Sequence, residues 1–130
     1  MKTEPTALDR EAAQLFSPAG GMRAAWRRER NGVRPAWERL RDGSEATPDF
    51  YDTDDPATVG CMLAQVEQAA NHTLSEVADN GDDHRRPERR HAVMVWSARG
   101  GCERHEAAHG PTRGAALVAA MRQIRRGVTP

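Results

Sequence analysis

The sequence contains almost no lysine and few cysteines or aromatic residues. Lys2 is the only lysine among 19 basic residues, so arginine carries nearly all of the positive charge. Cys61 and Cys102 are the only cysteines, too few for a disulfide framework, and they predict a reducing compartment. No apolar run reaches the roughly 18 residues of a membrane span or has the form of a signal peptide. These absences predict a cytoplasmic protein that does not bind membranes.

Charge is segregated along the chain, although the formal net charge is zero. Residues 1–41 hold nine Lys/Arg against five Asp/Glu, residues 42–83 hold eleven acids without Lys or Arg, and residues 84–130 hold ten Arg against three Glu. The acidic middle and the basic ends can pair inside one fold or between two copies of the chain. Alternatively, one surface presents a strong field to a charged partner.

The clearest helical pattern begins after residue 53. Asp54 and Asp55 can cap a helix, and Pro56 suits its first turn, where no backbone N–H is needed. Apolar residues then recur at steps of three and four, which predicts a one-sided helix over about 55–70. Residues 72–77 either extend this helix or form a short strand.

We expect residues 1–43 to form a basic helical segment. Thr6 and Asp9 form a weak capping box before a first short helix. Residues 22–30 and 33–41 are each interpreted as a helix, because apolar residues in each stretch can share one helical face. These two stretches interleave arginine with tryptophan at Arg23, Trp26, Arg27, Arg28, Arg30, Arg34, Trp37, Arg39 and Arg41.

The Arg/Trp-rich stretch 22–41 has two interpretations. Arginine and aromatic side chains can grip nucleic acid through phosphate contacts and base stacking, with Arg27, Arg28 and Arg30 as candidate binding residues. In the other interpretation both tryptophans belong to the core, and the arginines are a solvated face.

An acidic stretch over residues 44–55 is the second candidate surface. A carboxylate-rich surface can imitate nucleic-acid phosphates and occupy the basic groove of a protein partner. The candidate binding residues are Asp49, Phe50, Tyr51, Asp52, Asp54 and Asp55. The same acids can instead be a loop and a helix cap. The glycine and final glutamate of an EF-hand are missing here, and we expect no cofactor.

The C-terminal part predicts a strand hairpin followed by a helix. Residues 91–97 are β-branched and aromatic, Arg99-Gly100-Gly101 is typical of a turn, and residues 102–108 supply the partner strand. Thr112 can cap the last helix. The sequence therefore predicts an α+β fold, in which N-terminal helices precede a helix–strand–strand–helix sandwich over 44–130. Two strands are few for a stable sheet, so residues 72–77 add a third strand or a homodimer completes it.

His105-Glu106-Ala107-Ala108-His109 matches the H-E-x-x-H pattern of zinc peptidases. On a helix, His105 and His109 would share a zinc ion and Glu106 would act as the base. The following Gly110-Pro111 would end such a helix at once, and residues 110–130 contain no further ligand. In a strand the two histidines stand roughly 13 Å apart, too far to share a metal. The hairpin is therefore preferred, with a zinc-dependent hydrolase as an alternative.

Three segments resemble small accessory proteins of bacteriophages and prophages, including the phage αβα-sandwich domain. They are PDFYDTDDPATVGCMLAQV, HAVMVWS and AHGPTRGAALVAAMRQ, and together they extend over about residues 48–124. The resemblance implies a non-enzymatic protein in a bacterial host cell. Such a protein would bind and modulate a host protein or nucleoprotein complex, for example as an inhibitor of an antiviral defence complex.

Overall fold

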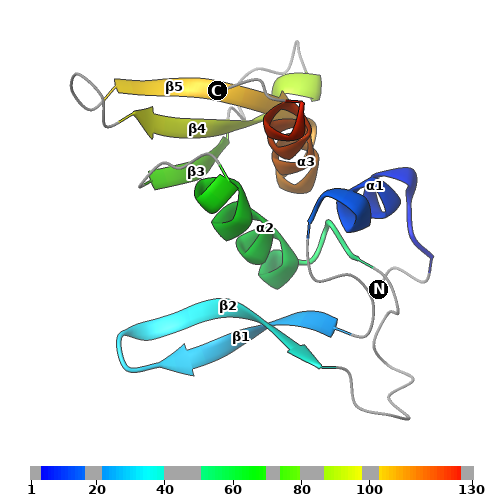
Figure 1. Ribbon diagram of the computed structural model, residues 1–130, viewed down its shortest axis with the longest axis vertical. Helices are drawn as coiled ribbons and strands as arrows, with labels where there is room; N and C mark the ends of the chain where they lie inside the picture. The colour runs from blue at the N-terminus through cyan, green and yellow to red at the C-terminus, as the bar shows by residue number, and fades with distance from the viewer. Residues whose placement is uncertain are drawn as a thin grey trace. The chain divides into compact units, whose positions relative to one another are not determined.

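The protein has an α+β fold in this computed structural model, which describes residues 4–16, 22–39, 51–69, 74–79, 87–97 and 103–126 (Figure 1). The predicted fold class is confirmed. In chain order the elements are α1 (Ala7–Leu15), β1 (Met22–Glu29), β2 (Gly32–Arg39), α2 (Pro56–Ala69), β3 (Leu74–Asp79), the short 3-10 helix η1 (Pro87–Arg89), β4 (His91–Ser97), β5 (Glu103–Gly110) and α3 (Arg113–Arg125).

The chain forms two compact units, Met1–Cys61 and Met62–Pro130, and the boundary between them falls inside α2. The domain boundary predicted after residue 43 lies outside the described residues. No helix in the described part of the chain is both long enough and apolar enough to cross a membrane.

The first unit is held together by a buried carboxylate near its N-terminus. Asp9 and Thr6 form the predicted capping box of α1, since Thr6 N donates to Asp9 Oδ2 at 2.8 Å and Asp9 N donates to Thr6 Oγ1 at 3.2 Å. The other oxygen of Asp9 accepts from Thr53 N at 2.9 Å and from Thr53 Oγ1 at 2.7 Å. Asp9 and Thr53 are each 1% exposed, so this carboxylate ties α1 to the segment that leads into α2.

Helix α2 begins where the sequence predicted. Asp55 Oδ2 accepts from both Thr58 N at 3.0 Å and Thr58 Oγ1 at 2.9 Å, and Pro56 is the first helical residue. This geometry satisfies an N–H of the first turn, which has no partner within the helix. The helix ends at Ala69, and Met62 and Val66 on its apolar stripe are fully buried.

The second unit contains a three-stranded antiparallel sheet in the order β3-β4-β5. The hairpin predicted from residues 91–97 and 102–108 is confirmed as β4 and β5. Residues 74–79 form a strand rather than an extension of α2, and β3 pairs with β4 from Leu74 opposite Trp96 to Asp79 opposite His91. The third strand therefore comes from the chain itself. The predicted homodimer stays a prediction.

Helix α3 packs on the β3-β4-β5 sheet (Figure 1). Val93 and Leu117 are 0% exposed and Met121 is 1% exposed, and they form the core of this unit. Thr112 caps α3 as predicted, because its Oγ1 accepts from Ala115 N at 3.1 Å. The end of β5 approaches the start of α3 so closely that a Cβ on Gly110 would lie 2.7 Å from the backbone nitrogen of Ala116.

The two helices predicted for residues 22–30 and 33–41 were wrong, because β1 and β2 form an antiparallel hairpin there. The helical interpretation used the four-residue spacing from Met22 to Trp26 and from Val33 to Trp37. That spacing fits a period of two as well as a period of 3.6. Alanine, arginine and glutamate favour helices in isolation, but the tight turn at Arg30-Asn31 lets the two stretches pair instead.

Candidate functional site

The β1–β2 hairpin brings together the arginines and tryptophans that the sequence placed on helices. Its pairing is regular from Met22 opposite Arg39 to Glu29 opposite Gly32. Gly32 has a φ of +131°, a conformation that residues with a side chain rarely adopt, so the glycine is required at this turn. The hairpin is therefore short, tightly closed and fixed in register.

Because side chains alternate along a strand, the hairpin has two different faces. We call the first the aromatic face, and its members are Ala24, Trp26, Arg28, Val33, Pro35 and Trp37. We call the second the charged face, and its members are Ala25, Arg27, Glu29, Arg34, Ala36 and Glu38.

The base of the aromatic face is anchored within the first unit. The ring of Trp37 lies 5.1 Å from that of Tyr51, and Tyr51 lies 6.3 Å from Phe16, measured between ring centroids. Pro35 occupies the space where Gly60 of α2 would carry a side chain, since a Cβ there would lie 2.6 Å from Pro35 Cγ. Tyr51 is 7% exposed and Phe16 is 3% exposed, so these contacts fix the root of the hairpin.

The part of the hairpin from Trp26 to Val33, which we call its tip, is more exposed. Trp26 is 56% exposed and Val33 is 60% exposed, and these are the large exposed apolar side chains of the described residues. The register places Trp26 opposite Pro35, one step along the aromatic face from the pair of Arg28 and Val33. Large apolar side chains left this exposed mark a surface that contacts another molecule.

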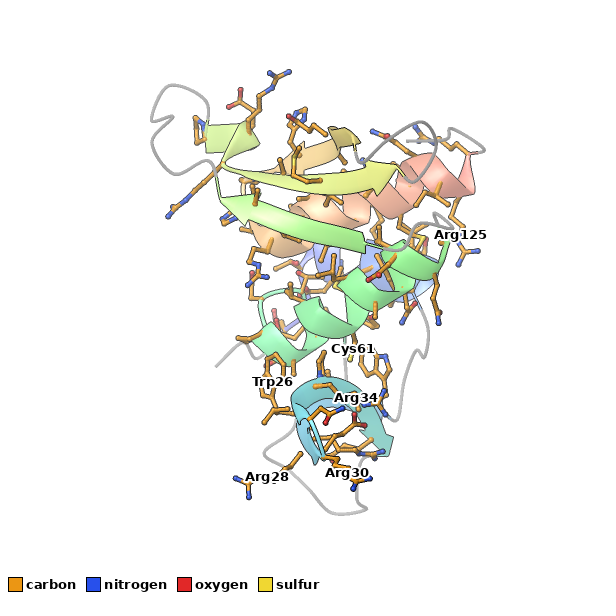
Figure 2. All side chains as sticks on the ribbon, turned by 90° about the vertical axis from the view of Figure 1, so that its left-hand side faces the viewer. Trp26, Arg28, Arg30, Arg34, Cys61 and Arg125 are labelled. Carbon is orange, nitrogen blue, oxygen red and sulfur yellow. The ribbon has the colours of Figure 1, made fainter. Side chains whose placement is uncertain are left out.

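Positive charge gathers around these apolar side chains. Arg27, Arg28 and Arg30, which we call the arginine cluster, are all exposed. Figure 2 shows Arg28 and Arg30 extending outward from the hairpin. No ion pair joins the arginine cluster to another side chain in the described part of the chain, whereas Arg34 Nε forms an ion pair with Glu29 Oε1. The three guanidinium groups are thus available to an external anion.

The structure describes only residues 51–55 of the acidic stretch. Asp49 and Phe50 lie outside the described residues. Asp52 Oδ1 accepts from Asp54 N at 2.9 Å, and Asp55 caps α2, so the backbone occupies both of these carboxylates. Asp54 is exposed. These contacts are those of a loop and a helix cap, which was one of the two interpretations of this stretch.

Tyr51 belongs to the interior of the first unit rather than to its surface. Its hydroxyl is buried and has no hydrogen-bond partner among the described residues. Burial, and secondarily the nearby Cys61, raise the pKa of Tyr51 well above its ordinary value. Burial first, and Asp55 second, raise the pKa of the free thiol of Cys61 to about 11. Both groups are therefore neutral at pH 7, and Tyr51 packs against Trp37 at the root of the hairpin.

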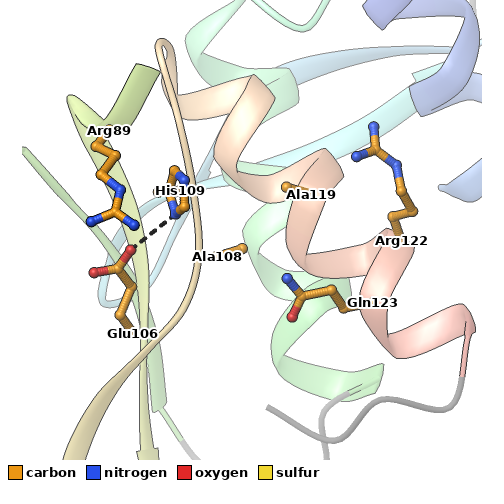
Figure 3. A pocket seen from close by; sticks show the side chains of 7 residues that line it. All are labelled: Arg89, Glu106, Ala108, His109, Ala119, Arg122 and Gln123. Carbon is orange, nitrogen blue, oxygen red and sulfur yellow. Dashed lines mark ion pairs between the residues drawn. The ribbon is translucent and has the colours of Figure 1, made fainter. Parts of the chain in front are cut away.

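The H-E-x-x-H motif lies on β5, as the hairpin interpretation predicted, and not on a helix. Met94 pairs with Glu106 while its neighbour Val93 pairs with Ala108, so Ala107 is an extra residue that forms a bulge. The bulge turns Glu106 and His109 to one side of the strand. His109 Nδ1 lies 3.1 Å from Glu106 Oε1, and both side chains are more than a third exposed (Figure 3).

The surroundings of this pair do not form a metal site in the described residues. An open hollow beside it is lined by Arg89, Glu106, Ala108, His109, Ala119, Arg122 and Gln123 (Figure 3). No group of three or more metal-ligating side chains occurs in the described ranges, and the side chain of His105 is not among those described. The helical arrangement that a zinc peptidase needs is not formed by residues 105–109.

Sequence reasoning missed two features of the first unit. The first is the hairpin that carries the exposed Trp26, and the Asn31-Gly32 dipeptide between two stretches with apolar residues at every second position was the available signal. The second is the pair of hydrogen bonds between Thr53 and Asp9, which span 44 residues and which no local sequence pattern predicts. No protein-family model, no curated protein and no solved structure matches this chain.

Proposed function

We propose that this protein binds nucleic acid through the tip of the β1–β2 hairpin. One observation carries the proposal, namely that Trp26 is 56% exposed beside three exposed arginines that form no ion pair in the described part of the chain. An exposed indole offers a face on which a base can stack, and unpaired guanidinium groups bind phosphate oxygens. The same side chains were a candidate interface in the sequence, although on the wrong secondary structure.

The charge balance of the hairpin supports this proposal. Residues 24–30 carry three arginines and one glutamate, so this part of β1 and the turn has a net charge of +2. A rigid arm with excess positive charge attracts a polyanion over a distance of about 8–10 Å at ordinary ionic strength. Because Trp37 and Pro35 anchor the hairpin, it is already held in place before it contacts nucleic acid.

The test is the salt dependence of binding to labelled DNA, both single-stranded and double-stranded, measured by fluorescence anisotropy. Counterion release makes the logarithm of affinity fall linearly with the logarithm of salt concentration. Replacing Arg27, Arg28 and Arg30 together by glutamine should reduce that slope by about two for a single strand. Absence of binding to either DNA at low salt would refute the proposal.

A matched control exists on the last helix. Arg113, Arg125 and Arg126 are also exposed, and replacing them by glutamine removes the same charge from the other unit. This variant should keep the wild-type salt slope if the hairpin is the site. An equal loss of affinity in both variants would mean that net charge alone drives association.

Binding of a host protein through the acidic stretch, including inhibition of a host defence complex, stays a prediction from the phage-protein resemblance. The described part of that stretch uses Asp52 and Asp55 for local backbone contacts and buries Tyr51. The hairpin therefore offers more exposed side chains to a partner than the described part of the acidic stretch does.

A further inference from the structure

The distribution of charge over the hairpin points to the form of nucleic acid that it binds. We infer that the tip binds a single strand, with one base stacked on Trp26 and the phosphates following β1 and the turn. The inference rests on the proposed function and deepens it. It depends on which strand of the hairpin carries the unpaired arginines.

Close to the turn the two strands differ in how many unpaired arginines they carry. Every member of the arginine cluster lies in β1 or in the turn that follows it. In β2 (Gly32–Arg39) two arginines stand against one glutamate, but Arg34 is already paired with Glu29, and Arg39 is the last residue of the strand, at the end away from the turn. Near the turn the unpaired cations therefore lie along the β1 edge, with Arg27 on the charged face and Arg28 on the aromatic face.

A duplex groove has two phosphate walls, one from each strand of the duplex. A β-ribbon that enters the major groove, about 12 Å wide, would need cations along both of its edges to contact both walls. Among residues 32–38 of β2 the one cation is Arg34, which is already paired with Glu29. A single strand presents only one line of phosphates, which arginines along one edge can follow.

The aromatic face supplies the complementary contact for unstacked bases. Trp26 and Val33 are diagonal neighbours on this face and are both more than half exposed, and Arg28 stands opposite Val33. Bases of a single strand are free to stack on an indole, whereas those of a duplex must first be separated from their neighbours. The exposed apolar area thus favours a strand whose bases are already unpaired.

The experiment compares an oligothymidylate of about 20 nucleotides with a duplex of equal length, each labelled and titrated with the full chain. The oligothymidylate should bind about tenfold or more tightly than the duplex. Trp26→Ala should weaken oligothymidylate binding about tenfold and leave duplex binding nearly unchanged, because stacking on one aromatic ring contributes on that scale. Trp26→Phe should recover part of the loss, since it restores a smaller aromatic face.

The outcomes separate this inference from the proposed function. Equal or tighter binding of the duplex, or an oligothymidylate affinity that Trp26→Ala does not change, would overturn the single-strand inference while hairpin-dependent binding still stood. Failure of both nucleic acids to bind would overturn the proposed function and the inference together. Circular dichroism on the Trp26 variants checks that the fold is kept, which the exposure of this side chain leads us to expect.

Discussion

The two hairpins of this protein, β1–β2 and β4–β5, differ in how far their side chains are covered by other elements. Helix α3 covers one face of β4–β5, where Val93 is 0% exposed and Ala108 is 5% exposed. Among the described residues, the contacts that anchor the β1–β2 hairpin lie at Pro35 and Trp37, and Val33 at its tip is 60% exposed. Valine thus occupies a strand in both hairpins, but only in β4 does it contribute to the core.

This difference shows which part of a small fold can supply side chains for binding a partner. A covered hairpin gains its stability from apolar burial, so its side chains are constrained by packing. A bare hairpin tip contributes little to stability, so its side chains are free to serve a partner. The substitutions below test this division, beginning with the largest expected effect.

Replacing Gly110 by alanine should destabilise the protein most. The added Cβ would lie 2.7 Å from Ala116 N and 2.8 Å from Ala115 Cβ, so β5 and α3 would have to move apart. We expect the free energy of unfolding to fall by about 3 kcal/mol in urea titrations. An unchanged urea midpoint would show that the contact between the strand end and α3 is not tight.

Replacing Val93 by alanine should cost about 2 kcal/mol, because it removes two buried methyl groups and leaves a cavity beside α3. The matched control is Val33→Ala, the same change at an exposed position in the other hairpin. Its effect on unfolding should be within about 0.5 kcal/mol. Equal losses for the two variants would break the comparison between the hairpins.

Replacing Gly32 by alanine should cost about 1 kcal/mol through backbone strain. No atom lies within 4 Å of the position that a Cβ would take. The expected cost therefore arises from the φ of +131° and not from a steric clash. Differential scanning calorimetry should show a smaller fall in Tm than for Gly110→Ala. If the tip binds nucleic acid, affinity should fall as well, because the turn sets the positions of the arginine cluster.

Alkaline pH should destabilise the first unit, which contains Cys61, in a graded manner. Folding raises the pKa of Cys61 from its ordinary 9.0 to about 11, so the folded state favours the neutral thiol. That contribution to stability is present below about pH 9 and is lost as the pH rises towards 11. In urea titrations across this range, Cys61→Ala should show a flatter decline in stability than the wild type. Parallel curves would contradict this assignment.

Local signals in the sequence predicted much of the fold. Thr6, Asp55 and Thr112 all cap the helices that were expected, because a cap needs only a few neighbouring residues. The strands β4 and β5 followed from composition and a glycine turn. In both cases the residues that form the sequence pattern are close together in the chain and also make the contacts in the structure.

The misassigned segment shows where local signals are insufficient. Residues 22–39 are rich in helix-forming alanine, arginine and glutamate, and the spacing of their apolar residues suits both periods. What selected the strand was pairing across the turn and packing of Pro35 and Trp37 against Gly60 and Tyr51. The packing contacts join residues far apart in the chain, as does the bond from Asp9 to Thr53.

The candidate site was predictable in its residues but not in its geometry. Arginine and tryptophan could be identified as nucleic-acid contacts from their types alone. Which tryptophan is exposed depends on what packs against each position of the aromatic face, and the structure leaves Trp26 open while Trp37 packs on Tyr51. The bulge at Ala107, which brings Glu106 beside His109, likewise follows from strand pairing and not from motif spacing.

The two-residue turn at Arg30-Asn31 also limits how the length of this arm can change over evolution. Inserting one residue into either strand would reverse the faces beyond the insertion, so that Trp26 or Trp37 would exchange sides with a charged neighbour. Adding two residues to each strand would keep both faces and the anchored root. Relatives of this chain should therefore have arms that differ in length by even steps, and a longer arm would extend its reach along a bound strand by roughly 7 Å for each such step.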